Sequence, residues 1–144
     1  MTDTLLVGVD GSAGGTRAAQ FAADRARETG ARLIVAYIIE WSPYTFNTPQ
    51  ENEVRHKRRE EEIARAETEV IRPLVDKLKG DGVSAEGLVR HGHAAEVLSQ
   101  IAKEHNAGQI FIGRRGQSKL QALLFGSVAS TLAQVSPVPV TVIP

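Results

Sequence analysis

Residues 5–12 read LLVGVDGS, a short apolar run followed by an Asp-Gly-Ser turn. A run that is apolar on both faces is typical of a strand in a parallel sheet that helices cover on both sides. Three similar runs follow it, namely LIVAYII (33–39), IFI (110–112) and VPVTVI (138–143). The chain is therefore expected to fold around a buried parallel sheet.

A fifth strand is predicted over VSAEGLVR (83–90), which follows the turn signal Gly80-Asp81-Gly82. This segment is more polar than the others, so we expect it at an edge of the sheet. The last run alternates, with valines at 138, 140 and 142 on one side and Pro139 and Thr141 on the other. Proline cannot donate to a β-ladder, which places this strand at an edge as well. Either a second copy of the chain or loops could cover that edge.

The segments between the strands have helical spacing. The clearest places apolar side chains at i, i+3, i+4, i+7 and i+8, which is one face of a helix: Ala94, Val97, Leu98, Ile101 and Ala102. A helix rich in small residues is predicted from Ala18, Ala19, Ala22 and Ala26 together with Phe21. A longer helix is predicted over 51–79. Pro73 lacks the N–H that would bond to the carbonyl of Glu69, so we expect a kink there.

Alternating strands and helices predict an α/β fold, a three-layer open sandwich with helices on both faces of a five-stranded parallel sheet. Residues 1–144 are expected to form a single domain. The strand order 3-2-1-4-5 would bring the ends of the first and fourth strands together, and the glycines after the fourth strand favour it. The order 2-1-3-4-5 would instead pair the first strand with the end of the third, at 90–92, where less binding chemistry is present.

Charge and composition exclude several classes of function. The chain has 17 basic and 17 acidic residues, so no overall attraction to nucleic acid or to an anionic membrane is expected. It has no cysteine, which rules out disulfides and thiolate chemistry. The first twelve residues carry no signal-peptide pattern, and no apolar run is long enough to span a membrane. A cytoplasmic protein is the expectation.

Ligands of open parallel sheets bind beyond the carboxyl ends of the strands, where the strand order reverses. Two strand ends carry suitable residues. The first strand is followed by Val9, Asp10, Gly11 and Ser12, and the fourth by Gly113, Arg114, Arg115 and Gly116. Gly126 and Ser127 then precede a short helix over 128–135, whose first N–H groups attract phosphate. Each glycine alone could equally be a turn residue, and Ser127 an ordinary helix cap.

Motifs for other kinds of site are absent or weak in this sequence. The glycines fit neither the P-loop, which ends in Gly-Lys-Ser/Thr, nor the dinucleotide fingerprint after the first strand. His91 and His93 could form a metal pair, but no third ligand is evident near them, so an ordinary loop is the preferred interpretation. The charged run at 55–62 fits a solvated helix face better than a nucleic-acid patch. No catalytic serine or histidine arrangement is visible.

The spacing Gly113-x2-Gly116-x9-Gly126-Ser127 after the fourth strand resembles the nucleotide-binding motif of the universal stress protein family. The similarity extends over the whole chain, through LLVGVDGS, LIVAYII, IFIGRRG and the closing SPVPVTVIP. It implies a Rossmann-like sandwich of the adenine-nucleotide α-hydrolase-like type. It also implies a homodimer formed through 138–143.

The resemblance further implies a role for each matching residue. Asp10 would bond the ribose or adenine side, and Ile38 would lie against the adenine and offer backbone polar groups. Gly113 and Gly116 would line the path of the ribose and phosphates, which the helix start would hold. A phosphate contact by Arg115 is our own addition, and a solvated loop tip is its alternative. The complete candidate set is Val9, Asp10, Gly11, Ser12, Ile38, Ile112, Gly113, Arg115, Gly116, Gly126, Ser127 and Val128.

The function expected from these residues is that of an ATP-binding regulatory module in a stress response, acting through an unknown client protein. ADP or AMP could replace ATP, and Mg²⁺ could accompany it. One alternative is an enzyme on the same fold, a slow ATPase or a phosphoryl-transfer enzyme. The other is a family member that binds no nucleotide and acts only by protein contacts. Since no catalytic base is apparent, at most weak ATP hydrolysis is expected.

Overall fold

A computed structural model describes residues 3–40, 49–114 and 127–144. Its strands are β1 Thr4–Val9, β2 Arg32–Glu40, β3 Ser84–Gly92, β4 Gln109–Gly113 and β5 Val140–Ile143. Its helices are α1 Ala13–Thr29, α2 Pro49–Ala66, the π-helical turn η1 Glu67–Ile71, α3 Arg72–Gly80, α4 Ala94–Glu104 and α5 Ser127–Val135. The predicted alternation of strands and helices is confirmed.

The sheet is five-stranded and parallel, with the order β3-β2-β1-β4-β5. This is the predicted order 3-2-1-4-5, and the polar β3 lies at an edge, as expected. In the register, Gly8 pairs with Ala36 of β2 on one side and with Ile112 of β4 on the other. The central strand β1 therefore brings the ends of β2 and β4 to either side of its own end.

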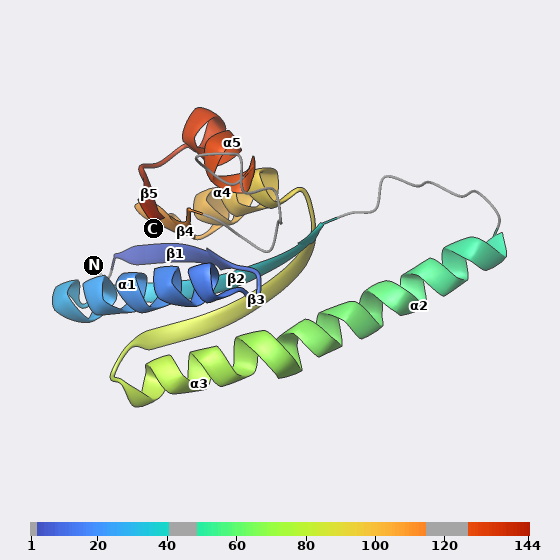
Figure 1. Ribbon diagram of the computed structural model, residues 1–144, viewed down its shortest axis with the longest axis horizontal. Coiled ribbons are helices and arrows are strands. Elements are labelled where there is room, and N and C mark those ends of the chain that lie inside the picture. The colour runs from blue at the N-terminus through green and yellow to red at the C-terminus, as the bar shows by residue number, and fades with distance from the viewer. Residues whose placement is uncertain (1–2, 41–48, 115–126) are drawn as a thin grey trace.

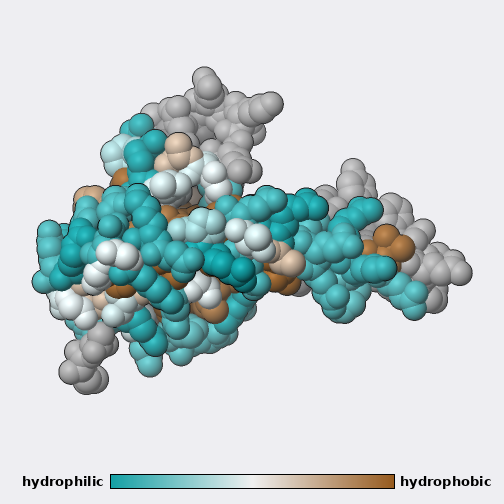
Figure 2. Space-filling model, turned by 90° about the horizontal axis from the view of Figure 1, so that it is seen from below, coloured by the Kyte–Doolittle hydropathy of each residue, from teal (hydrophilic) through white to brown (hydrophobic). Residues whose placement is uncertain are grey.

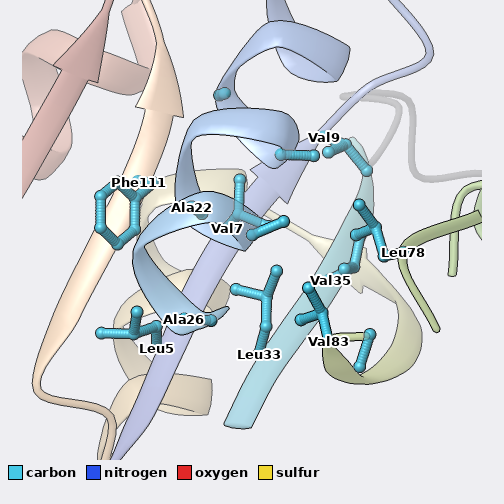
Figure 3. Packing of buried hydrophobic residues seen from close by; sticks show 14 of the residues in the cluster. Leu5, Val7, Val9, Ala22, Ala26, Leu33, Val35, Leu78, Val83 and Phe111 are labelled. Carbon is cyan, nitrogen blue, oxygen red and sulfur yellow. The ribbon is translucent and has the colours of Figure 1, made fainter. Parts of the chain in front are cut away.

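Helices cover both faces of the sheet, which gives the three-layer sandwich (Figure 1). On one face, α1 and α3 pack on alternate residues of β1 and β2, with Leu33 and Phe111 fully buried (Figure 3). The four alanines predicted to face the sheet from α1 are buried. Phe21, predicted on the same face, is instead 45% exposed, because it lies at the border of that face with its ring 6.0 Å from that of Phe111.

On the other face, α4 and α5 pack on the intervening residues of the same strands. Leu6, Ile34 and Ile110 are fully buried there. All five residues predicted to form the apolar face of α4 are buried. The two cores thus follow directly from the alternation of side chains along strands that are apolar on both faces.

The long helix predicted over 51–79 changes its hydrogen-bond pattern close to Pro73, where a kink was expected. Instead of a sharp bend at the proline, the backbone forms the π-helical turn η1 just before it, and α2 and α3 continue along one line in Figure 1. Ile71 of η1 lies directly over Gly87 of β3, where an added Cβ would come within 2.2 Å of Ile71 Cγ2. Beyond the sheet, α2 projects with the described side chains of 56–61 exposed, and this part of the surface is mostly hydrophilic (Figure 2).

The last strand is shorter than predicted, since Pro139 lies before it and β5 begins at Val140. The carbonyl of Pro139 still accepts a hydrogen bond from the N–H of Ile110, at 2.9 Å. Val138, Val140 and Val142 pack on the α4 side, as their alternation predicted. β5 forms the edge of the sheet beside β4. Among the helices that the structure describes, none has the length and apolar character needed to cross a membrane.

Candidate ligand-binding site

A cavity of about 510 Å³ opens at the carboxyl ends of β1, β2 and β4, with the first turns of α4 and α5 beside it. Its lining residues are Gly8, Val9, Asp10, Gly15, Ala36, Tyr37, Ile38, Ile39, Glu40, Ala94, Leu98, Ile112, Gly113, Ser127, Val128 and Ala129. This is the crevice in which open parallel sheets bind ligands. A volume of this size is within the usual range for small-molecule sites.

The cavity brings together most of the candidate residues taken from the sequence. Seven of them line it: Val9, Asp10, Ile38, Ile112, Gly113, Ser127 and Val128. Gly11 and Ser12 form the turn that follows Asp10, without being part of the lining. The remaining three candidates, Arg115, Gly116 and Gly126, lie outside the described residues. Sequence reasoning missed the other nine lining residues.

Gly8 leaves room for the apolar side chains that line the cavity, because it has no side chain of its own. A Cβ at this position would come within 2.9 Å of Leu98 Cδ1 and 3.0 Å of Ile112 Cδ1. Both of those side chains line the cavity, so a larger residue would displace its apolar wall. The sequence contains a signal for this role, because a glycine inside a strand often marks the close approach of another group.

The turn between β1 and α1 holds the carboxylate of Asp10 in place. Gly11 has a left-handed φ of 82°, which lets the chain reverse so that Ser12 folds back on Asp10. Asp10 Oδ1 accepts hydrogen bonds from the N–H of Ser12, at 3.0 Å, and from its hydroxyl. The same Ser12 Oγ accepts the N–H of Gly15 at 3.2 Å and so caps α1. One serine therefore connects the helix start with the carboxylate at the cavity.

Gly15 has a similar steric role on the other side of that carboxylate. An added Cβ there would lie 3.2 Å from the backbone N and from Oδ1 of Asp10, and 3.3 Å from Val9 Cα. Two of these three atoms belong to the backbone and cannot move aside easily. The first turn of α1 can therefore approach the end of β1 only because position 15 carries no side chain.

Tyr37 of β2 is among the residues that line the cavity, and its side chain packs against the core on the α1 and α3 side of the sheet. Its pKa is raised above the ordinary value, first by burial and then by the negative charges of Asp10 and Glu62. The phenol is therefore neutral at all physiological pH values, and it can both donate and accept a hydrogen bond.

The end of β2 extends beyond its pairing with β1. Val9 and Tyr37 are the last pair between these strands, whereas β2 remains paired with β3 as far as Glu40 and Gly92. The segment 38–40 thus has β3 on one side and the cavity on the other. Since this segment lines the cavity, backbone groups there could bind the edge of a flat ligand.

Glu40 closes the β2 end of the cavity by contacting α4. Its Oε1 accepts the N–H of Ala94 at 3.0 Å, and its Oε2 lies 3.7 Å from His93 Nδ1. A carboxylate at the first turn of a helix is favoured by the free N–H groups and by the helix dipole. The sequence gives no local signal for this contact, because 54 residues separate Glu40 from Ala94.

The charges around the cavity are unequally distributed. Asp10 and Glu40 are the charged side chains among the described lining residues, and both are acidic. The electropositive element is the N-terminus of α5, where Ser127 and Val128 line the cavity. Glu40 lines the cavity from the end of β2, whereas Ser127 and Val128 line it from the start of α5, a helix that packs against α4 and β5.

The two histidines considered as a metal pair contact different glutamates. His91 Nε2 lies 3.2 Å from Glu62 Oε2 of α2, while His93 lies beside Glu40. In the described ranges, no group of three or more metal-ligating side chains comes together. The contact between Glu62 and His91 instead joins α2 to the end of β3.

Comparison with known proteins gives a consistent result. A family model described as the universal stress protein family matches residues 1–144. A universal stress protein of Thermus aquaticus is 32% identical over 145 residues, which cover 99% of this chain and 99% of that protein.

Solved structures share the fold. Universal stress protein UspA from Lactobacillus plantarum has a TM-score of 0.84 and 23% identity, covering 99% of this chain and 97% of its own. A universal stress protein in complex with cAMP has a TM-score of 0.67 and 24% identity, with coverages of 99% and 96%. One from Archaeoglobus fulgidus in complex with dAMP has a TM-score of 0.66 and 20% identity, with coverages of 100% and 98%. On its sequence matches, the chain belongs to the universal stress protein family.

Proposed function

We propose that the chain binds an adenine nucleotide in the cavity at the ends of β1, β2 and β4. The observation that carries this proposal is the position of the cavity between the end of β2 and the start of α5. Its β2 side offers apolar surface and hydrogen-bond acceptors, which suit a base and a ribose. Its α5 side offers a helix N-terminus, which suits phosphate.

The proposed ligand lies across β1. The adenine packs against Ile38, the ribose hydroxyls donate to Asp10, and the phosphates accept from the first N–H groups of α5 and from Ser127. Gly113 lets the backbone approach the ribose and phosphates, and Gly11 and Ser12 hold Asp10. The candidates Arg115, Gly116 and Gly126, which lie outside the described residues, keep the roles that the sequence suggested for them.

Two structures of the same fold support an adenine nucleotide rather than another phosphorylated ligand. They are complexes with cAMP and dAMP, which share an adenine ring and a single phosphate. For this chain, ATP, ADP and AMP are all proposed ligands. Mg²⁺ would enter with ATP, held largely by phosphate oxygens and water, and so needs few protein ligands.

We place this binding in a regulatory role, in which a cytoplasmic homodimer joined through 138–143 responds to nucleotide and acts on a client protein in a stress response. The position of β5 at the edge of the sheet supports the dimer, because a strand edge invites another strand. The alternative of a slow ATPase is favoured only by Asp10, a carboxylate that could hold a metal near the phosphates. The alternative of a protein-only function predicts no nucleotide at all.

The direct test is to denature the purified protein and to identify the small molecules released, and then to measure the melting temperature with added ATP, ADP, AMP and cAMP. Adenine nucleotide in the released fraction, or a rise in melting temperature, is the expected result. Absence of both would overturn the proposal in favour of a protein-only function. Steady turnover of ATP would favour the enzyme.

A matched pair of glycines locates the site. Gly113 ends β4 at the cavity, whereas Gly108 precedes the same strand, with no atom within 4 Å of a built Cβ. Gly113→Val is expected to abolish the nucleotide-induced thermal shift, since its side chain would enter the proposed ligand path. Gly108→Val should leave that shift unchanged. Equal loss in both variants would mean that the shift does not report on this cavity.

A further inference from the structure

We infer that Glu40 is the residue that recognises the exocyclic amine of the bound base. This inference rests on the proposed function and makes it more specific. It assigns to a glutamate at the end of β2 the discrimination between an aminopurine and a purine that lacks the amino group. The carrying observation is a cavity-lining carboxylate that accepts a hydrogen bond from the first turn of α4 through Oε1 and has His93 beside Oε2.

The position of Glu40 fits the rim of a purine. Along a strand, alternate residues share a face, so Ala36, Ile38 and Glu40 all project toward the α4 side of the sheet. Strands rise roughly 3.3 Å per residue, which places Glu40 about 7 Å beyond Ile38. A purine ring that packs on Ile38 would therefore present its edge to the carboxylate of Glu40.

The contact with Ala94 fixes the carboxylate while leaving acceptor capacity for a ligand. An ionised carboxylate offers about four lone-pair sites, and the N–H of Ala94 uses one of them on Oε1. The Oε2 atom lies 3.7 Å from His93 Nδ1, which is longer than an ordinary N–H···O hydrogen bond. Glu40 can therefore cap α4 and accept from a ligand at the same time.

Charge determines which part of a nucleotide meets Glu40. A phosphate would be repelled by this carboxylate, which already occupies the N-terminus of α4, whereas the N-terminus of α5 attracts it. The base must then lie on the Glu40 side. A carboxylate only accepts hydrogen bonds, so it favours an edge that carries N–H donors, such as the amino group of adenine.

A thermodynamic cycle, in which one change is made in the ligand and one in the protein, tests this assignment. The dissociation constants of AMP and of purine riboside monophosphate, which has hydrogen in place of the amino group, are measured for the unaltered protein and for Glu40→Ala. The unaltered protein is expected to favour AMP by about tenfold, because the lost bond involves a charged acceptor. In Glu40→Ala this preference should disappear. An equal preference in both proteins would overturn the inference.

Glu40→Gln separates recognition from capping. The amide oxygen of glutamine can still accept the N–H of Ala94, so a purely structural role would be rescued by this variant. Its NH₂ group would then face the amino group of the ligand, two donors together, and the preference for AMP should stay lost. If Glu40→Gln keeps the full preference, Glu40 only caps the helix and the inference is wrong.

A control carboxylate and the affinity of the unaltered protein complete the test. Glu86→Gln removes an exposed carboxylate from β3, outside the cavity lining, and should leave the preference for AMP unchanged. If the unaltered protein binds neither AMP nor ATP, the proposed function fails and this inference fails with it. If it binds AMP and the cycle shows no coupling with Glu40, only the inference fails.

Discussion

Asp10 and Glu40 are two carboxylates at the same edge of one sheet, and they are held in different ways. Asp10 is bound by Ser12, two residues along the chain, in a turn that also caps α1. Glu40 is bound by Ala94, 54 residues away, across a contact between β2 and α4. The first arrangement is local and rigid, whereas the second exists only when the sheet and α4 are packed together.

This difference indicates that the two ends of the cavity contribute differently to folding and to ligand binding. The β1 turn forms one unit in which a strand end, a left-handed glycine and a helix cap occur within six residues, 10–15. The β2 end depends on the relative position of two elements that are distant in sequence. Changes at the first unit should therefore affect the stability of the protein, and changes at the second should affect the ligand more than the fold.

The largest effect is expected where the local unit is disrupted sterically. Gly15→Val would place methyl groups against the backbone of Val9 and Asp10, which cannot move aside. We expect a loss of about 2 kcal/mol or more in the free energy of unfolding, as for overpacked cores. Gly80→Ala is the control, since its Cβ would meet no atom within 4 Å. Urea denaturation compares the two variants; equal stabilities would contradict the close approach of α1 to β1.

A smaller loss is expected when the local unit loses its serine. Ser12→Ala removes the cap of α1 and a partner of Asp10 together, and should reduce the stability by about 1 kcal/mol, typical of an N-cap. Ser12→Asp should recover part of the cap but place a second carboxylate beside Asp10, and so weaken nucleotide binding. Thermal unfolding measures the first effect and calorimetric titration the second. An unchanged melting temperature in Ser12→Ala would show that the cap contributes nothing.

The charge of Asp10 should be detectable at Tyr37, across the boundary between β1 and β2. Asp10→Asn removes a negative charge that raises the pKa of Tyr37, so this pKa should fall while remaining above the usual value, because burial is the larger cause. An absorbance titration of the phenolate, in a Tyr44→Phe background, measures the change. A folded-state pKa that is raised stabilises the fold below the unfolded value of about 10, and this contribution disappears as the pH rises through the folded pKa. If the pKa of Tyr37 is the same in Asp10→Asn, the two side chains do not interact electrostatically.

The smallest effect concerns a third carboxylate, which also depends on a contact between distant elements. Glu104 of α4 accepts a hydrogen bond from Arg90 of β3 at 2.9 Å, and this bond lowers its pKa. Arg90→Met should return that pKa toward the usual value of about 4.3, as measured by carboxyl NMR. Because the folded pKa is lowered, the contact stabilises the fold above the unfolded pKa and is lost as the pH falls through the folded one. At this exposed site the melting temperature should barely change.

Much of the fold could be predicted because its signals are local. Strands that are apolar on both faces and the helical stripe after Gly92 predicted the class. The polar third strand and Pro139 predicted the two edge strands, and the glycines after the fourth strand favoured the order. The errors concern tertiary packing. Phe21 was assigned to the buried face although it lies at its border. The effect of Pro73 was expected as a kink, whereas the chain forms a π-helical turn that lets Ile71 approach Gly87.

For the candidate site, the sequence by itself determined the β1 turn, because the Asp-Gly-Ser sequence and the following helix are adjacent in the chain and their hydrogen bonds span only a few residues. Only the tertiary structure decided which residues share the cavity with it. Glu40, Ala94 and Leu98 belong to strands and helices whose distance from Asp10 depends on strand order and on how α4 packs on the sheet. Such contacts leave no pattern in the local sequence, because the two residues of each contact are far apart in the chain and meet only after the whole sheet is assembled.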